Sequence, residues 1–155
     1  MKIHYLVGNA TEPQTRENTQ NFIVHVCNDI GVWGAGFVLA LSKKWNEPKR
    51  MYEAMFPQHG TLGCVSFAPV EENLTVVNMI AQHGIRWRHG IPPIRYAALS
   101  DCLESVGHMA RCSDGSRIHM PRIGCGLAGG QWEMVEPLIK EWLYKLEVYV
   151  YDLPK

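Results

Sequence analysis

Apolar residues along this chain recur in short runs that alternate with longer amphipathic stretches. The short runs are rich in β-branched and aromatic residues and stop at turn-forming residues, as buried strands do. They predict strands at residues 2–7, 22–27, 61–69, 74–80, 118–121 and 148–151. Apolar residues at helical spacing predict helices at residues 37–45, 51–56, 94–112 and 132–146.

The order of these elements predicts the fold class. Strands that alternate with helices predict an α/β fold, a three-layer α/β/α sandwich around a central mixed, largely parallel sheet. Residues 61–69 and 74–80, joined by an acidic turn, predict a hairpin at or near this sheet. Residues 82–93 combine Gly, Pro, His and Arg and predict a long loop, which we interpret as a candidate lid. A length of 155 residues predicts one domain, residues 1–155.

Composition narrows the choice of partners and location. Basic and acidic residues both number 15, so the formal net charge is zero and does not favour binding to nucleic acid or to a membrane surface. The five cysteines are odd in number, widely spread and without a CxxC pair, which argues against a disulfide framework and a zinc site. No apolar stretch has the length of a membrane span or a signal peptide. We therefore expect a cytoplasmic protein with no membrane partner, no metal and no cofactor.

Two glycine-rich segments, residues 31–36 (GVWGAG) and 124–130 (GCGLAGG), each follow an apolar strand and precede a helix. Glycines let main-chain N–H groups turn inward beside a helix N-terminus, where they bind anionic oxygens. Ligands of open α/β sheets settle beyond the carboxyl ends of the strands, so both segments are expected to flank one diphosphate. Ordinary turn glycines are the alternative. Neither segment matches GxxxxGK[ST] or a complete GxGxxG, which argues against a nucleoside triphosphatase.

Three strings of residues resemble, in order, the motifs of macrodomains. They are residues 7–11 (VGNAT), residues 24–29 (VHVCND) running into GAG at 34–36, and residues 120–127 (MPRIGCGL) followed by QWE at 131–133. The third string is the most specific, and the similarity covers residues 2–151. It is greatest to the class that includes the terminal ADP-ribose protein glycohydrolase and bacterial relatives acting on ADP-ribosylated DNA. The resemblance implies a macrodomain fold that binds ADP-ribose.

The resemblance also implies roles for matched positions. Asn9 stands where the family usually has an Asp that receives the adenine amino group, and an Asn carbonyl can accept the same bond. Asn28 matches a contact of the distal ribose, and Trp33 either covers that ribose or anchors its loop to the core. The ligand-binding residues implied are Gly8, Asn9, Ala10, Asn28, Trp33, Gly34, Ala35, Gly36, Phe37, Ile80, Gln82, Ile123, Gly124, Cys125, Gly126, Leu127, Ala128 and Gly129.

The chemistry of cleavage departs from the glycohydrolase class. A lysine and an aspartate are associated with cleavage there, and Gln82 and Ala128 stand at those positions here, so a covalent lysine mechanism does not carry over. Release of ADP-ribose through an oxocarbenium-like state still needs a positioned water. We hypothesise that a substrate phosphate polarises this water, that Gln82 and Asn28 orient it, and that Asp29 or His83 assists proton transfer. An Asx-type turn or helix cap is the alternative for Asp29.

One local patch concentrates cations around an aromatic ring. Arg86, Trp87 and Arg88 predict contacts with phosphates and a stacked base, and hence a preference for ADP-ribosylated nucleic acid. A solvated surface loop is the alternative. Our first interpretation is a hydrolase that removes ADP-ribose from an acidic side chain of modified protein or from nucleic acid. A non-enzymatic ADP-ribose reader and an ADP-ribose 1''-phosphate phosphatase are the rival interpretations.

Overall fold

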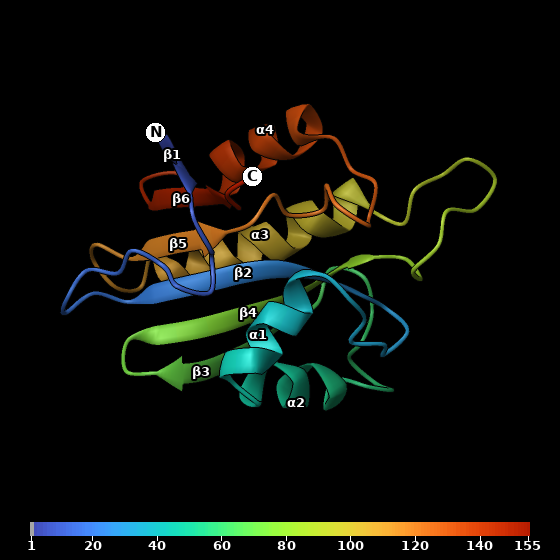
Figure 1. Cartoon of the computed structure of the whole chain (residues 1–155), viewed down its shortest axis with the longest axis horizontal. Helices are drawn as coiled ribbons and strands as arrows, with labels where there is room; N and C mark the ends of the chain where they lie inside the picture. Colours follow the sequence, from blue (N-terminus) through green and yellow to red (C-terminus); the bar gives the residue numbers. More distant parts are fainter. Residues whose placement is uncertain (1) are drawn as a thin grey trace.

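Six strands form one sheet through the centre of the molecule (Figure 1). The computed structural model describes residues 2–155. Its strands are β1 (Ile3–Val7), β2 (Asn21–Asn28), β3 (Val65–Glu71), β4 (Leu74–Gln82), β5 (Arg117–Met120) and β6 (Glu147–Asp152). They lie side by side in the order β1-β6-β5-β2-β4-β3, and every neighbouring pair is parallel except β3 and β4. The predicted mixed, largely parallel sheet is therefore confirmed.

The hairpin of β3 and β4 lies at one edge of the sheet, but its first strand is shorter than predicted. Residues 61–64 form a turn instead of strand, because Gly63 and Cys64 donate their N–H groups to Ile80 and Thr61. β3 then begins at Val65 and runs on to Glu71, inside the segment that we expected to form the turn. The connecting turn is thereby reduced to residues 72–73.

Four helices cover the sheet: α1 (Phe37–Lys44), α2 (Glu47–Glu53), α3 (Tyr96–Ala110) and α4 (Trp132–Trp142). The prediction for α2 was wrong at both ends, since it placed the helix at residues 51–56. Pro48 lies in the first turn of α2. A proline there has the fixed φ of a helix and lacks only an N–H that no helical carbonyl would accept. The helix therefore begins before the apolar residues that suggested it.

Side chains of β2 alternate between the two faces of the sheet. Phe22 and Val24 pack with α3 and α4 in the main core, while Ile23 and Cys27 pack on the opposite face, which carries α1 and α2. In Figure 1, α1 accordingly lies in front of the strands and α3 behind them. The three-layer α/β/α sandwich is confirmed. Within residues 2–155 no helix is both long and apolar enough to cross a membrane.

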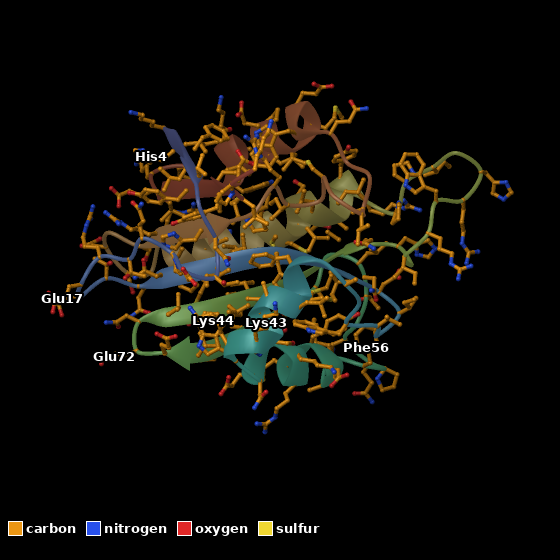
Figure 2. All side chains as sticks on the ribbon, viewed as in Figure 1. His4, Glu17, Lys43, Lys44, Phe56 and Glu72 are labelled. Atoms are coloured by element: carbon orange, nitrogen blue, oxygen red, sulfur yellow. The ribbon has the colours of Figure 1, made fainter. Side chains whose placement is uncertain are left out.

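The carboxyl ends of the parallel strands lie at one edge of the sheet, where the chain can form a site. From the central strand β2 the chain continues to α1 on one face, and from its neighbour β5 it continues to α4 on the other. Connections that diverge from adjacent strands leave a crevice between them. Figure 2 labels Glu17 and Glu72 at the opposite end of the molecule, where β2 and β4 begin.

Candidate functional site

Three adjoining cavities form one groove along the carboxyl ends of the strands. Their volumes are about 400, 280 and 560 Å³. The first and second cavities share Gly36, Phe37 and Pro121. The second and third share five residues: Val26, Ala35, Val38, Gln82 and Leu127. We refer to the two ends as the Asn9 end, at the first cavity, and the Asn28 end, at the third.

The two glycine segments meet in the middle of this groove. A Cβ added to Gly36 would lie 3.7 Å from the Leu127 side chain, so the segments are in contact although they are far apart in sequence. Gly36 and Gly124 have φ angles of 85° and 73°, a left-handed conformation that side chains rarely adopt. The expected convergence of the two segments on one crevice is what the structure shows.

Both segments present main-chain donors that the protein leaves free. Among the main-chain N–H groups that donate to no acceptor in the described chain are those of Gly34, Ala35, Gly36, Gly126, Leu127 and Ala128. Helix α1 starts directly after the first group and has no side-chain cap. Unsatisfied N–H groups beside a helix N-terminus attract anions. Within this groove they can hold the oxygens of a diphosphate without any lysine or arginine.

The Asn9 end is largely apolar. Its walls include Phe37, Tyr151 and Leu153, and its edge is formed by residues 8–10. The side-chain oxygen Oδ1 of Asn9 accepts the N–H of Thr11 at 2.9 Å and the hydroxyl of Thr11 at 2.8 Å. The expectation that this oxygen would receive an adenine amino group is thus corrected, because a turn within the loop already uses it.

The side chain of Asn28 holds the first glycine segment in place. Its Oδ1 accepts the N–H groups of Ile30 (3.1 Å) and Val32 (3.3 Å) and the hydroxyl of Tyr52 (2.7 Å), while its Nδ2 donates to the carbonyl of Val32 at 2.6 Å. Asn28 also lines the cavity, as expected of a ribose contact. One Nδ2 hydrogen is the group that it can offer to a ligand.

Trp33 also lines the Asn28 end while its ring is tied to the core. Its Nε1 donates to the hydroxyl of Ser42 in α1 at 2.8 Å, and its ring packs edge-on against His25 with 5.6 Å between ring centres. These contacts support the anchoring interpretation. The same ring is also placed to cover a ribose.

The structure brings Gln82 and Asn28 together but places Asp29 elsewhere. Gln82 lines the middle cavity and the Asn28 end, and its Nε2 donates to the carbonyl of Gly84 at 3.1 Å, which leaves Oε1 free to accept. Asp29 accepts the N–H of Gly84 at 2.8 Å and contacts the His83 ring at 2.7 Å. Asp29 and His83 are not among the residues that line the three cavities. They hold the start of the 83–93 loop.

The electrostatics of Asp29 suit this holding role. Burial raises the pKa of Asp29, but the hydrogen bonds from Gly84 and His83 outweigh it and bring the pKa below its usual value. The carboxylate is therefore ionised at neutral pH and acts as an acceptor. A group with a lowered pKa is a weak base, which fits the Asx-type alternative better than proton transfer.

Three further predicted ligand residues are not among those that line the three cavities. The Ile80 side chain is fully buried against α2, because the alternation of β4 turns it to that face. Cys125 packs against the main core, and burial raises the pKa of its thiol. Gly129 lies against the Trp87 ring, which a Cβ would approach to 2.6 Å. The assignment of these three residues to the ligand therefore stays a prediction.

Several groove residues were missed from the sequence. They are His25, Val26, Val38 and Arg122 in the middle, Ala40, Pro121, Tyr151 and Leu153 toward the Asn9 end, and Cys27, Val32 and Ile85 toward the Asn28 end. Burial lowers the pKa of His25 to about 4, so its ring is neutral. Strand alternation gave a signal for it, since His25 shares a face of β2 with Ile23 and Cys27.

The cationic patch borders the Asn28 end. Trp87 is 57% exposed and also lines that cavity, and Arg86 and Arg88 are exposed on either side of it. The aromatic ring of the patch is thus part of the wall at the Asn28 end.

Comparison with known proteins agrees with this geometry. No protein-family profile matches the chain. A Bacteroides thetaiotaomicron protein of unknown function has 49% identity, a TM-score of 0.93 and 99% coverage of both chains. A macrodomain protein from Streptomyces coelicolor has 41% identity and a TM-score of 0.83, over 97% of this chain and 99% of its own.

The names of some more distant relatives state an activity or a bound ligand. The mouse chromodomain-helicase-DNA-binding protein 1-like is 30% identical over 99% of this chain, which spans only 18% of that relative's length. An ADP-ribose 1''-phosphate phosphatase of Candida albicans is 21% identical over 90% of this chain and 93% of its own. Thermosipho africanus DarTG, solved in complex with ADP-ribose, is 16% identical with a TM-score of 0.66 over 89% of this chain and 39% of its own, and shows the fold alone.

Proposed function

The chain belongs to the macrodomain family, and from that premise we propose that its groove binds ADP-ribose. The observation that carries the proposal is the free main-chain N–H groups of the two glycine segments, both of which line the middle cavity. The distant relatives support it, since one was solved with ADP-ribose and another is named for a phosphorylated form of it.

The shape of the groove sets the direction of the ligand. The diphosphate lies between Gly36 and Gly126, where the anion-binding N–H groups are. The purine nucleoside lies at the Asn9 end, whose apolar walls suit a base. The distal ribose then lies at the Asn28 end, beside Gln82 and under Trp33.

At the Asn28 end we propose hydrolysis of the bond between the anomeric carbon and an acidic side chain of a protein or a nucleic-acid group. Gln82 accepts a hydrogen bond from the attacking water through Oε1 and holds it below the anomeric carbon. A glutamine amide is not a base, so a phosphate oxygen of the substrate takes up the proton. Asn28 fixes the loop that carries the ribose contact.

Two other functions use the same groove. The Candida relative supports a phosphatase that acts on ADP-ribose 1''-phosphate. A reader that binds without cleaving is favoured by Gln82 and Ala128, which supply neither acid nor base.

Among larger substrates, Arg86, Trp87 and Arg88 support nucleic acid, because exposed cations around an aromatic ring contact phosphates and stack on bases. Five free cysteines support a reducing, cytoplasmic location.

Calorimetry with ADP-ribose tests binding, and three hydrolysis reactions test the chemistry. The substrates are ADP-ribosylated protein modified on acidic residues, ADP-ribosylated oligonucleotide and ADP-ribose 1''-phosphate. Product from only one substrate identifies the reaction, and binding without product in all three identifies a reader. Absence of binding heat would exclude the proposed function.

A graded pair of variants localises the ligand. A Cβ on Gly126 would meet no atom within 4 Å, so Gly126→Ala and Gly126→Val add bulk to the groove with little strain. We expect affinity for ADP-ribose to fall from wild type to Gly126→Ala to Gly126→Val, with unchanged thermal unfolding of the free protein. Equal affinity in all three would place the diphosphate elsewhere.

A further inference from the structure

The main-chain pairing of β5 with β6 ends before the groove. The last residues paired between these strands are Met120 and Val150. Beyond them the chain from β5 leads into the second glycine segment, while β6 continues to Asp152. Within the described chain, the hydrogen bonds that join these two stretches come from the Arg122 side chain. Its Nε donates to Oδ1 of Asp152 at 2.9 Å, and its Nη2 donates to Oδ2 at 2.8 Å.

Two aromatic rings hold the guanidinium group of Arg122 in place. The group lies over the rings of Tyr5 in β1 and Trp132 in α4, 4.9 Å from each ring centre. Nε1 of Trp132 donates to the Tyr5 hydroxyl at 3.0 Å, which fixes the two rings relative to one another. A planar guanidinium both matches a carboxylate with two parallel hydrogen bonds and stacks on aromatic rings. The Arg122 side chain is therefore held in one orientation.

The neighbours of this ion pair form walls of the groove. Pro121, the residue before the arginine, lines the first and the middle cavities. Tyr151 and Leu153, on either side of Asp152, line the first cavity. Gly8 lines it too, and its N–H donates to the main-chain carbonyl of Asp152 at 2.8 Å. The ion pair thus connects the start of the second glycine segment to the walls of the Asn9 end.

A second ion pair joins the same two strands at their other ends. Arg117 and Glu147, the first residues of β5 and β6, are 2.9 Å apart, and Arg117 also lies over an aromatic ring. Neither residue lines any of the three cavities. The Arg117 side chain is 15% exposed, against 37% for Arg122 and 44% for Asp152. Because exposed ion pairs contribute little to stability, the fold gains no more from the pair at the groove than from the pair far from it.

We infer that Arg122 is a positioning residue for the adenosine half of the ligand; the inference rests on the proposed function, in which the first cavity holds the base. Through Asp152, Arg122 sets the distance between the second glycine segment, which binds the diphosphate, and the wall of the base cavity. Base and diphosphate belong to one ligand, so both are bound at full strength only when these two parts of the groove are correctly spaced. Without the ion pair the two parts move independently, and affinity falls.

Calorimetry on two arginine variants tests this role. Arg122→Met keeps an apolar stem against the rings but removes the hydrogen bonds to Asp152. We expect it to bind ADP-ribose about tenfold more weakly, a loss the size of one contact. ADP, which lacks the distal ribose, should lose affinity by the same factor. Arg117→Met is the matched control and should change either affinity less than about twofold.

The outcomes separate the inference from the function on which it rests. Wild-type affinity in Arg122→Met would overturn the inference and leave the proposed function intact. An equal loss in Arg122→Met and Arg117→Met would trace the effect to the fold as a whole and overturn it as well. A loss for ADP-ribose without a loss for ADP would place the effect at the Asn28 end, against the inference. No binding of ADP-ribose by the wild type would overturn the proposed function too.

Asp152→Ala distinguishes positioning from direct contact with the ligand. It removes the carboxylate but keeps the main-chain carbonyl that accepts the N–H of Gly8. We expect an affinity loss of about tenfold, and about tenfold again, not a hundredfold, in the double variant Arg122→Met, Asp152→Ala, because both residues act through one ion pair. If Arg122 instead bound the diphosphate directly, Asp152→Ala would free its charge and keep or raise the affinity. That result, or a hundredfold loss in the double variant, would overturn the inference.

Discussion

The two ends of the groove each have an asparagine at or just after the end of a strand, and the two side chains do different work. Asn28 is 6% exposed, and its amide bonds Ile30, Val32 and Tyr52. Asn9 is half-buried and bonds only Thr11, two residues further on. The side-chain amide of Asn28 thus holds the wall of the groove in place, whereas the side-chain amide of Asn9 remains available to a ligand. The two asparagines differ because helix α2 brings the Tyr52 hydroxyl to Asn28 and not to Asn9.

Truncating the two asparagines gives the largest expected contrast. Asn28→Ala removes four side-chain hydrogen bonds, although the Tyr52 hydroxyl keeps the main-chain carbonyl of residue 28 as an acceptor, whereas Asn9→Ala removes two. At about 1 kcal/mol for each bond, we expect the free energy of unfolding to fall by about 4 kcal/mol for Asn28→Ala, against about 2 kcal/mol for Asn9→Ala. Urea unfolding measures both. Equal losses would mean that the two asparagines are structurally equivalent.

Acidification is expected to lower the free energy of unfolding through one buried histidine near each end of the groove. His25 packs against Trp33 near the Asn28 end, and His119 contacts Tyr151 at the Asn9 end. Burial lowers the pKa of His25 to about 4, and burial together with the charge of Arg117 lowers that of His119 to about 3. An unfolded chain with histidine pKa values near 6.5 binds more protons below that pH, so stability falls as the pH drops. We expect a loss of about 2–4 kcal/mol between pH 7 and pH 5.

Single substitutions measure how much each histidine contributes to the pH dependence of stability. His25→Gln and His119→Gln should each remove roughly half of the pH dependence measured by urea unfolding. His108→Gln, in an exposed position of α3, should leave it unchanged. A pH dependence that persists in the double variant His25→Gln, His119→Gln would assign it to the carboxylates instead.

Gln82 tests whether the Asn28 end places a water. We expect Gln82→Ala to lower the hydrolysis rate about tenfold, since positioning is lost while no acid or base is removed. Affinity for ADP-ribose should change less than about twofold, because the N–H groups of the glycine segments remain. Gln82→Glu keeps an acceptor and should retain more activity than Gln82→Ala. Full activity in both variants would remove Gln82 from the mechanism.

The smallest effect is expected at Asp29. Its ion pair with His83 involves a histidine side chain that is 56% exposed, so Asp29→Asn should change the unfolding free energy by about 0.5 kcal/mol or less. Hydrogen exchange in residues 84–91 should become faster, because the 83–93 loop loses part of its attachment. A hundredfold loss of hydrolysis with unchanged exchange would return Asp29 to the catalytic role that we first assigned to it.

The sequence predicted those parts of the site that depend on local patterns. Apolar runs ending in glycine placed both segments at the carboxyl ends of β2 and β5, and strand–helix alternation gave the layers. Ordered motifs identified Asn9, Asn28 and Gln82 as groove residues, and the structure places all three there. Local spacing was sufficient because Asn28 and Gln82 end their strands and Asn9 lies two residues after the end of β1.

The remaining features depend on contacts that local spacing does not encode. The role of Asn28 is set by Tyr52, which belongs to a helix that begins earlier than its apolar residues indicate. Ile80 was assigned to the ligand although the register of β4 turns it into the core. Asp29 was predicted to assist proton transfer, but in the structure its carboxylate accepts the N–H of Gly84 in the 83–93 loop. In each case a partner distant in sequence decides what the side chain does.

The groove is lined by residues 8–10, 36–37, 121–124 and 126–128, segments that come together only when the central sheet is complete. A partly unfolded chain therefore has no binding site, and the ligand stabilises only the native state. At a concentration one hundred times its dissociation constant, a nucleotide would add about 2.7 kcal/mol to the folding equilibrium. A shift in melting temperature is consequently a direct screen for ligands of this protein.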